Sequence, residues 1–180
     1  VEHPVTEQIT GVDLVGLQLK IAQGERIILN QGDIKSNGYA IEARLYAENP
    51  ASNFLPTSGK VQKLKFPNIS GLRIDSDLKN GDLVNIYFDP MLAKIIAHDI
   101  SREKAINKLK YALSKIVFLG PTTNIELLKN ILSSKSFIKG EYNTNFVFEN
   151  NKMIQTDRDQ STIENVVIAA TLFRSSKRNI

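Results

Sequence analysis

The sequence predicts an α+β fold, in which short strands fill the middle of the chain and helices follow them. Side chains alternate between apolar and polar over residues 39–47, which indicates a strand, and apolar side chains recur at helical spacing after Ser101. Hydrophobic residues make up 42% of the 180 residues and charged residues 23%. This composition is that of an ordinary globular domain with a core, and it excludes intrinsic disorder.

The N-terminal segment is expected to contain one helix between two irregular stretches. Residues 1–10 should be an extended lead-in, because Pro4 disfavours helical backbone at the residue before it. A helix should begin at residues 10–13, which resemble a capping box, and end at Gly24. Its apolar positions recur at helical spacing: Leu14, Leu17 and Ile21. Residues 25–37 read as a polar connection.

Residues 39–47 form the clearest strand. Strand periodicity places Glu42, Arg44 and Tyr46 side by side on its polar face. An arginine on a central strand is costly to bury unless it is paired or faces a cleft. Two interpretations stay open: Arg44 is an oriented cation that stabilises a developing anion, or it forms a structural pair with Glu42.

The middle of the chain is predicted to hold a turn and several short strands. Proline, asparagine, serine and glycine mark a turn region over residues 49–59. Short strands are expected near residues 60–66, 71–75 and 83–88, and a longer one over 91–98.

The second half begins with a strong helix that Ser101 can cap and that residues 120–121 should end. Its apolar stripe consists of Ala105, Ile106, Leu109, Ala112, Leu113 and Ile116. Thr123 and Glu126 form a capping box for the next helix, and a short strand is possible at residues 145–148. An amphipathic helix is predicted over residues 163–173.

Composition excludes several classes of function. The chain contains no Cys, so disulfides, cysteine zinc sites and thiol nucleophiles are ruled out. The 23 basic residues are scattered among 19 acidic ones, so the net charge of +4 does not indicate nucleic-acid binding. Neither a membrane span nor a signal peptide is seen, and we expect a cytoplasmic location. The chain starts with Val1 rather than Met, and we expect it to be a piece of a longer protein.

Several colinear motifs resemble those of biotin carboxylases, the ATP-grasp enzymes that carboxylate biotin. Residues 1–14, VEHPVTEQITGVDL, resemble the family's VEHPVTE-x-ITG-x-DLV. Residues 38–48, GYAIEARLYAE, resemble its GHA-x-EARIYAED. Further segments match in order: 54–59 its FLPSTG, 72–76 its VRVDS, 89–94 its YDPMIAK, and Thr123 with Asn124 its TN. The resemblance covers about residues 1–149.

The resemblance implies roles for individual residues. Glu2 matches the catalytic base that deprotonates bicarbonate. Arg44 matches the arginine that stabilises the biotin enolate, in agreement with its reading as an oriented cation. Val1 matches a residue whose backbone lies near the bicarbonate and biotin pocket. Asp89 matches a residue that orients the arginine, and Glu42 is a competing candidate for that pairing.

The resemblance also implies domains and cofactors. Residues 1–35 would end an ATP-grasp domain, 36–149 would form the biotin carboxylase C-terminal domain, and 150–180 would be a linker and the first helix of the next region. Biotin, ATP and magnesium are the implied cofactors. The family's ATP- and metal-binding groups lie upstream of its VEHPVTE motif, so no metal site is expected here. Phe146 aligns with an apolar residue beside the adenine.

The parent implied by the resemblance is an acyl-CoA carboxylase α subunit of the methylcrotonyl- or propionyl-CoA type. The alternative is the biotin carboxylase subunit of acetyl-CoA carboxylase. Its partners would be a biotin carrier region and a carboxyltransferase β subunit, with a possible homodimer. A different class of function is a structural or dimerisation module that has no catalysis of its own.

Overall fold

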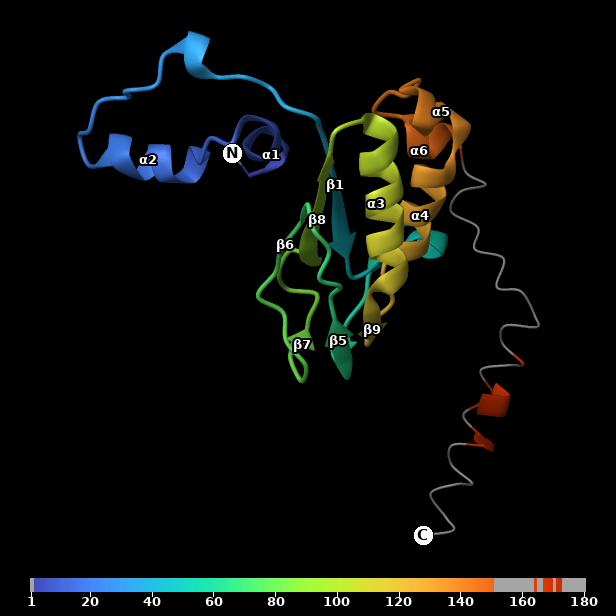
Figure 1. Ribbon diagram of the computed structural model, residues 1–180. Coiled ribbons are helices and arrows are strands. Elements are labelled where there is room, and N and C mark those ends of the chain that lie inside the picture. The colour runs from blue at the N-terminus through green and yellow to red at the C-terminus, as the bar shows by residue number, and fades with distance from the viewer. Residues whose placement is uncertain (1, 151–163, 165–166, 170, 173–180) are drawn as a thin grey trace.

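The computed structural model describes residues 2–150, 164, 167–169 and 171–172. Its centre is a three-stranded antiparallel sheet in the order β1-β8-β6, made of β1 (Tyr39–Tyr46), β8 (Met91–Asp99) and β6 (Leu72–Asp75). Figure 1 shows helices α3 to α6 on one side of this sheet and α1 with α2 on the other. The α+β expectation is therefore confirmed.

The predicted strand at residues 39–47 is confirmed as β1, an edge strand whose two faces differ as expected. Ala43 and Leu45 are buried in the core, while Arg44 on the opposite face is exposed. β1 pairs with β8 in a register that sets Arg44 opposite Lys94. Because opposite residues of an antiparallel pair share a face, these two cations are neighbours.

The long helix is α3 (Arg102–Lys115), and it packs on β8 and β1. Ser101 caps it by accepting a hydrogen bond from the Lys104 N–H at 3.3 Å, as predicted. Its buried side chains are Ala105, Ile106, Leu109, Ala112 and Leu113. Together with the apolar face of β1 and β8 they form the main core, which gives the polar face of β1 a rigid support.

The predicted short strands lie in three two-stranded sheets and β6. β4 (Gly59–Lys60) pairs with β7 (Leu83–Val84), and β5 (Lys63–Lys65) pairs with β9 (Val117–Leu119). β2 (Glu48–Asn49) pairs with β3 (Leu55–Pro56) across the turn region. The strand expected over 83–88 covers only its first two residues.

The extended lead-in predicted for residues 1–10 is wrong, because α1 (Val5–Thr10) is a helix. Pro4 occupies the cap position of that helix rather than a place inside it, and a proline near a helix start removes no hydrogen bond that the helix needs. α2 (Leu14–Ala22) was predicted, but its cap is Asp13, whose carboxylate accepts from the Gly16 N–H at 2.8 Å. A 3₁₀ turn (Gln31–Asp33) lies in the connection that follows.

α1 is held on the sheet by an ion-pair network. Arg73 of β6 donates to Glu7 at 2.7 Å and to Asp75 at 2.8 Å, and the Leu14 N–H donates to Glu7 at 2.8 Å. The hydrogen bond from Arg73 holds the pKa of Glu7 below its ordinary value. This network fixes the segment that immediately follows Glu2 and His3.

The C-terminal half departs from prediction at three points. α3 ends at Lys115, and β9 stands between it and residues 120–121. α4 (Ile125–Ser133) begins after Asn124 and has no side-chain cap, so the predicted box of Thr123 and Glu126 is wrong. α5 (Lys135–Lys139) and α6 (Phe146–Glu149) follow. α6 replaces the strand expected at 145–148, because an Asn143 turn that accepts the Asn145 N–H at 2.7 Å starts a helix there.

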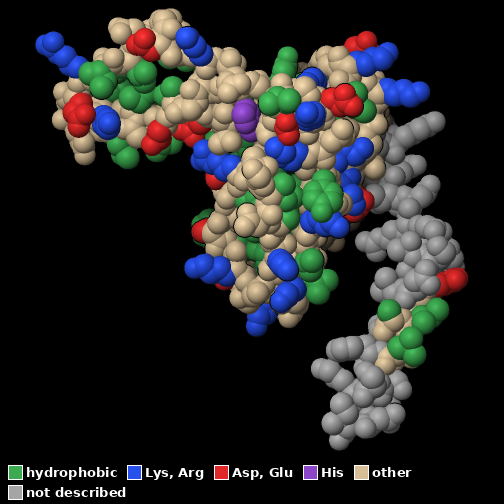
Figure 2. Space-filling view, viewed as in Figure 1, with side chains coloured by type: hydrophobic (Ala, Val, Ile, Leu, Met, Phe, Trp, Pro, Cys, Tyr) green, Lys and Arg blue, Asp and Glu red, His purple; other side chains and the backbone are tan. Residues whose placement is uncertain are grey.

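Two sequence-based expectations concern the surface and the end of the chain. Figure 2 shows Lys and Arg side chains spread over the visible face with Asp and Glu among them, in agreement with the scattered charge. None of the helices in the described part of the chain is long and apolar enough to span a membrane. Residues 164, 167–169 and 171–172 of the predicted tail helix are helical, and its other positions lie outside the described residues.

Candidate active site

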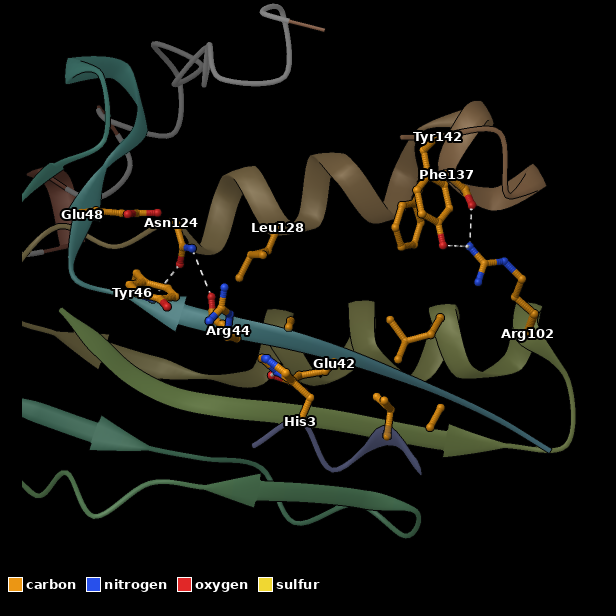
Figure 3. A pocket seen from close by; sticks show the side chains of 14 residues that line it. His3, Glu42, Arg44, Tyr46, Glu48, Arg102, Asn124, Leu128, Phe137 and Tyr142 are labelled. Atoms are coloured by element: carbon orange, nitrogen blue, oxygen red, sulfur yellow. Dashed lines mark hydrogen bonds and ion pairs between the residues drawn. The ribbon is translucent and has the colours of Figure 1, made fainter. Parts of the chain in front are cut away.

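A groove of about 600 Å³ runs along β1. β1 supplies the polar side chains Glu42, Arg44 and Tyr46, and His3 reaches the groove from the segment before α1. Figure 3 shows Asn124 beside Tyr46 and Arg44 at one end, and Arg102, Phe137 and Tyr142 at the other. Segments from both ends of the described chain therefore meet on the polar face of one strand.

Arg44 is the cation at the centre of this face. Its guanidinium lies 5.4 Å from the centre of the Tyr46 ring and forms no hydrogen bond or ion pair with any other described residue. Its cross-strand neighbour Lys94 donates to the backbone carbonyl of Glu2 at 2.7 Å, not to a carboxylate. Two adjacent cations without a carboxylate to neutralise them favour an anion at this position.

The environment of Tyr46 shows which charges gather here. Burial raises the pKa of the Tyr46 hydroxyl, and the nearby charges of Asp89, Glu48 and Glu2 raise it further, while Arg44 acts in the opposite direction. Glu2, Arg44 and Asp89 come from three separate segments of the sequence. The fold brings these predicted site residues around one hydroxyl.

Glu42 does not pair with Arg44, as the structural interpretation required. Its carboxylate accepts from His3 at 3.0 Å instead. Asp89 accepts from the Met91 N–H at 2.8 Å, so its carboxylate shapes the turn before β8. Within the described residues, neither carboxylate holds Arg44 directly.

Glu2 is accessible, as a base that meets a small substrate must be. Its side chain is 62% exposed, and one of its carboxylate oxygens lies 4.0 Å from the His3 ring. Val1, the other N-terminal residue predicted to line the site, lies outside the described residues. The sequence motif alone therefore assigned Glu2, and the fold adds its position over the polar face.

Asn124 is a site residue whose role was not predicted. It is 5% exposed, and it closes the free edge of β1 with three hydrogen bonds. Its side chain accepts from the Tyr46 N–H at 3.0 Å and donates to the Arg44 carbonyl at 3.1 Å, while its backbone N–H donates to the Tyr46 carbonyl at 3.2 Å. Burial raises the pKa of the adjacent Glu48, and Asn124 and Arg44 counteract that rise. A buried amide fixes the backbone that carries Arg44.

We expect Asn124→Ala to lower the free energy of unfolding by about 1–3 kcal/mol, because partly buried backbone groups of residues 44 and 46 lose their partners. Chemical denaturation of the 180-residue chain measures this change. The matched control is Asn68→Ala, at an exposed position, which should shift stability by less than about 0.5 kcal/mol. Equal effects of the two substitutions would contradict the role of Asn124.

The far end of the groove is an aromatic cluster around Arg102, a residue that the sequence gave no reason to single out. Arg102 donates to the Phe137 carbonyl at 2.8 Å, and its guanidinium lies over the rings of Phe137 and Tyr142 at 5.2 and 5.7 Å. Phe146 is 7% exposed and meets Tyr142 edge-on, with ring centres 6.1 Å apart. Phe146 therefore supports the wall of the groove from behind.

The described residues do not fit a metal ion. No group of three or more His, Asp or Glu side chains within the described part of the chain converges closely enough to hold one. Phosphate groups bound through magnesium need such ligands. The groove therefore offers cations and a carboxylate for a small anion, and no magnesium site.

Comparison with protein-family models identifies the fold. The model of the biotin carboxylase C-terminal domain matches residues 42–149, and that of the ATP-binding domain of the carbamoyl-phosphate synthase L chain matches residues 1–30. The chain belongs to the biotin carboxylase family. The resemblance seen in the motifs is thus confirmed, and the groove lies within the matched C-terminal domain.

Curated relatives include carboxylases of several kinds. The α subunit of mitochondrial methylcrotonoyl-CoA carboxylase from Dictyostelium discoideum is 40% identical over 172 residues, which are 95% of this chain and 25% of that protein. Biotin carboxylase 1 of Bacillus subtilis is 42% identical over 147 residues, 82% of this chain and 33% of that protein. The chain thus spans about a quarter to a third of the length of these relatives.

Solved biotin carboxylase structures share the fold. The biotin carboxylase domain dimer of the Hydrogenobacter thermophilus 2-oxoglutarate carboxylase, in complex with MgADP, ADP and bicarbonate, matches with a TM-score of 0.85 and 37% identity. The match covers 88% of this chain and 35% of that one. The biotin carboxylase subunit of a pyruvate carboxylase matches equally well, with a TM-score of 0.85.

Proposed function

We propose that this chain is the C-terminal part of a biotin carboxylase, and that the whole protein carboxylates biotin with ATP and bicarbonate. The observation that carries the proposal is Arg44, a guanidinium without a carboxylate partner in the described chain, set beside Lys94 and close to Glu2. Such an arrangement suits a reaction in which a base deprotonates a small anion and a cation receives developing negative charge.

Each residue has a separate task in this proposal. Glu2 accepts the proton of bicarbonate, for which its exposed carboxylate is available. Arg44 donates hydrogen bonds to an oxygen that gains negative charge, and its planar fork suits that task better than an ammonium group does. The charge of Asp89 acts on the same pocket through Tyr46. Val1 and Phe146 are proposed to line the bicarbonate and adenine sides.

Biotin fits the groove by size and by polarity. When bound, biotin supplies the nitrogen that receives the carboxyl group. Arg44 and Tyr46 would hold its polar ring, and Leu128 lies in the same groove wall for its apolar part. ATP and magnesium do not fit the described residues, so we assign their binding to the other part of the whole protein.

The domain organisation and the holoenzyme are part of the proposal. Residues 1–35 would end the ATP-grasp domain, 36–149 form the C-terminal domain and 150–180 lead onward. An acyl-CoA carboxylase α subunit is favoured, since methylcrotonoyl- and propionyl-CoA carboxylase chains match 95% and 98% of this chain. A biotin carrier region and a carboxyltransferase subunit would be its partners. A homodimer is supported by the dimeric state of a structural relative.

The test is carboxylation of free biotin by the protein that the full reading frame encodes. With labelled bicarbonate, we expect label in biotin that depends on both ATP and bicarbonate. Absence of label from a folded, nucleotide-binding protein would overturn the proposal. It would favour the alternative function, a dimerisation module without catalysis.

We expect the 180-residue chain alone to release no phosphate from ATP above a blank without protein. The reason is that phosphoryl transfer needs groups that grip phosphate and metal, and the described residues bring no such set together. Phosphate release in the presence of bicarbonate and biotin measures this. Biotin-dependent release by the purified chain would contradict the assignment of ATP binding to another part.

A further inference from the structure

We propose that Glu42, His3 and Lys94 form a clamp that positions Glu2 beside Arg44. The inference rests on the proposed role of Glu2 as the base. The clamp grips the short segment before α1 at two points, the His3 ring and the Glu2 carbonyl. Its members are positioning residues, because they act on the reaction through Glu2.

The first contact point is the pair between Glu42 and His3. The Glu42 side chain is only 8% exposed, whereas that of His3 is 50% exposed. A buried carboxylate is unfavourable unless it is paired, so Glu42 requires a partner. His3 supplies it at 3.0 Å from a segment 39 residues away in the sequence. The pair therefore ties the N-terminal segment to β1.

The second contact point is Lys94. Its ammonium donates to the Glu2 carbonyl at 2.7 Å, across 92 residues of sequence. Lys94 lies opposite Arg44 in the register of β1 and β8, and Glu42 lies two residues from Arg44 on the same face. Both contacts thus attach to the rigid sheet directly next to Arg44.

Two contacts on either side of one peptide leave little freedom except in the Glu2 side chain itself. The Arg73 network holds the following helix, so the segment is fixed from that side as well. A base that must meet its proton within hydrogen-bond reach loses rate when it is displaced by even 1 Å, by as much as about 10²-fold. The sheet thereby sets the distance between the base and the cation.

The test uses Glu42→Gln, His3→Gln and their double variant in the protein that the full reading frame encodes. The readout is bicarbonate-dependent ATP cleavage, with the melting temperature measured on the same preparations. We expect each single variant to lose about tenfold in kcat and the double variant to lose no more than that, because the two residues act as one pair. Glu25→Gln, at an exposed site, is the matched control and should leave kcat unchanged.

Placing Glu42→Gln in a Glu2→Gln background separates positioning from a general structural role. Since the clamp acts through Glu2, it should cause no further loss there. A further tenfold loss, or wild-type kcat in both single variants, would overturn the clamp alone. Near-normal turnover of Glu2→Gln by itself would overturn the proposed function and the clamp with it. Should Glu42→Gln fail to fold, His3→Gln at a half-exposed position provides the same comparisons.

Discussion

Replacement of Glu2 by Gln in the protein of the full reading frame is expected to lower bicarbonate-dependent ATP cleavage by roughly 10²–10⁴-fold, the usual contribution of a positioned base. Glutamine keeps the size of the side chain but cannot accept the proton of bicarbonate. The Glu2 side chain is 62% exposed, so its replacement should leave the fold intact. Phosphate release at saturating bicarbonate measures the loss.

Two controls accompany the Glu2 experiment. ATP binding should change little, because the site holds no metal ligands among the described residues. Glu25→Gln, which changes an exposed carboxylate in the connection after α2, should retain full activity. Near-normal turnover of Glu2→Gln would mean that this carboxylate is structural and would remove the base from the proposal.

Arg44→Ala is expected to depress the carboxylation of biotin by roughly 10²–10³-fold, the cost of removing one preorganised donor to a developing anion. Bicarbonate-dependent ATP cleavage should fall less, because it precedes the transfer of the carboxyl group. Arg44→Lys should restore only part of the lost rate, since an ammonium lacks the planar fork of a guanidinium. Measuring both partial reactions on one preparation tests this order.

A purely structural Arg44 predicts a different result. Both reactions would then fall together with the melting temperature as folded protein is lost. The guanidinium makes no ion pair with any described residue, which argues for little loss of stability. Arg26→Ala, at an exposed position in the connection after α2, is the matched control. Equal loss of both reactions with a large drop in stability would refute the role of Arg44.

The sequence by itself determined the faces of the main elements and the family. Period-two alternation placed Arg44 and Glu42 on the polar face of β1, and helical spacing gave the buried stripe of α3. These features depend on local periodicity, which a sequence displays directly. The motifs identified the family because several of them occur in the same order along the chain.

Tertiary structure decided which of these side chains meet. The pairing of Glu42 with His3, and not with Arg44, joins residues far apart in sequence, and no local pattern encodes it. Asn124 owes its role to the free edge of β1, which exists only after the sheet has formed. Contacts within the α1 segment likewise turned an expected extended lead-in into a helix. Periodicity fixes the direction of a side chain, whereas packing between distant segments fixes its partner.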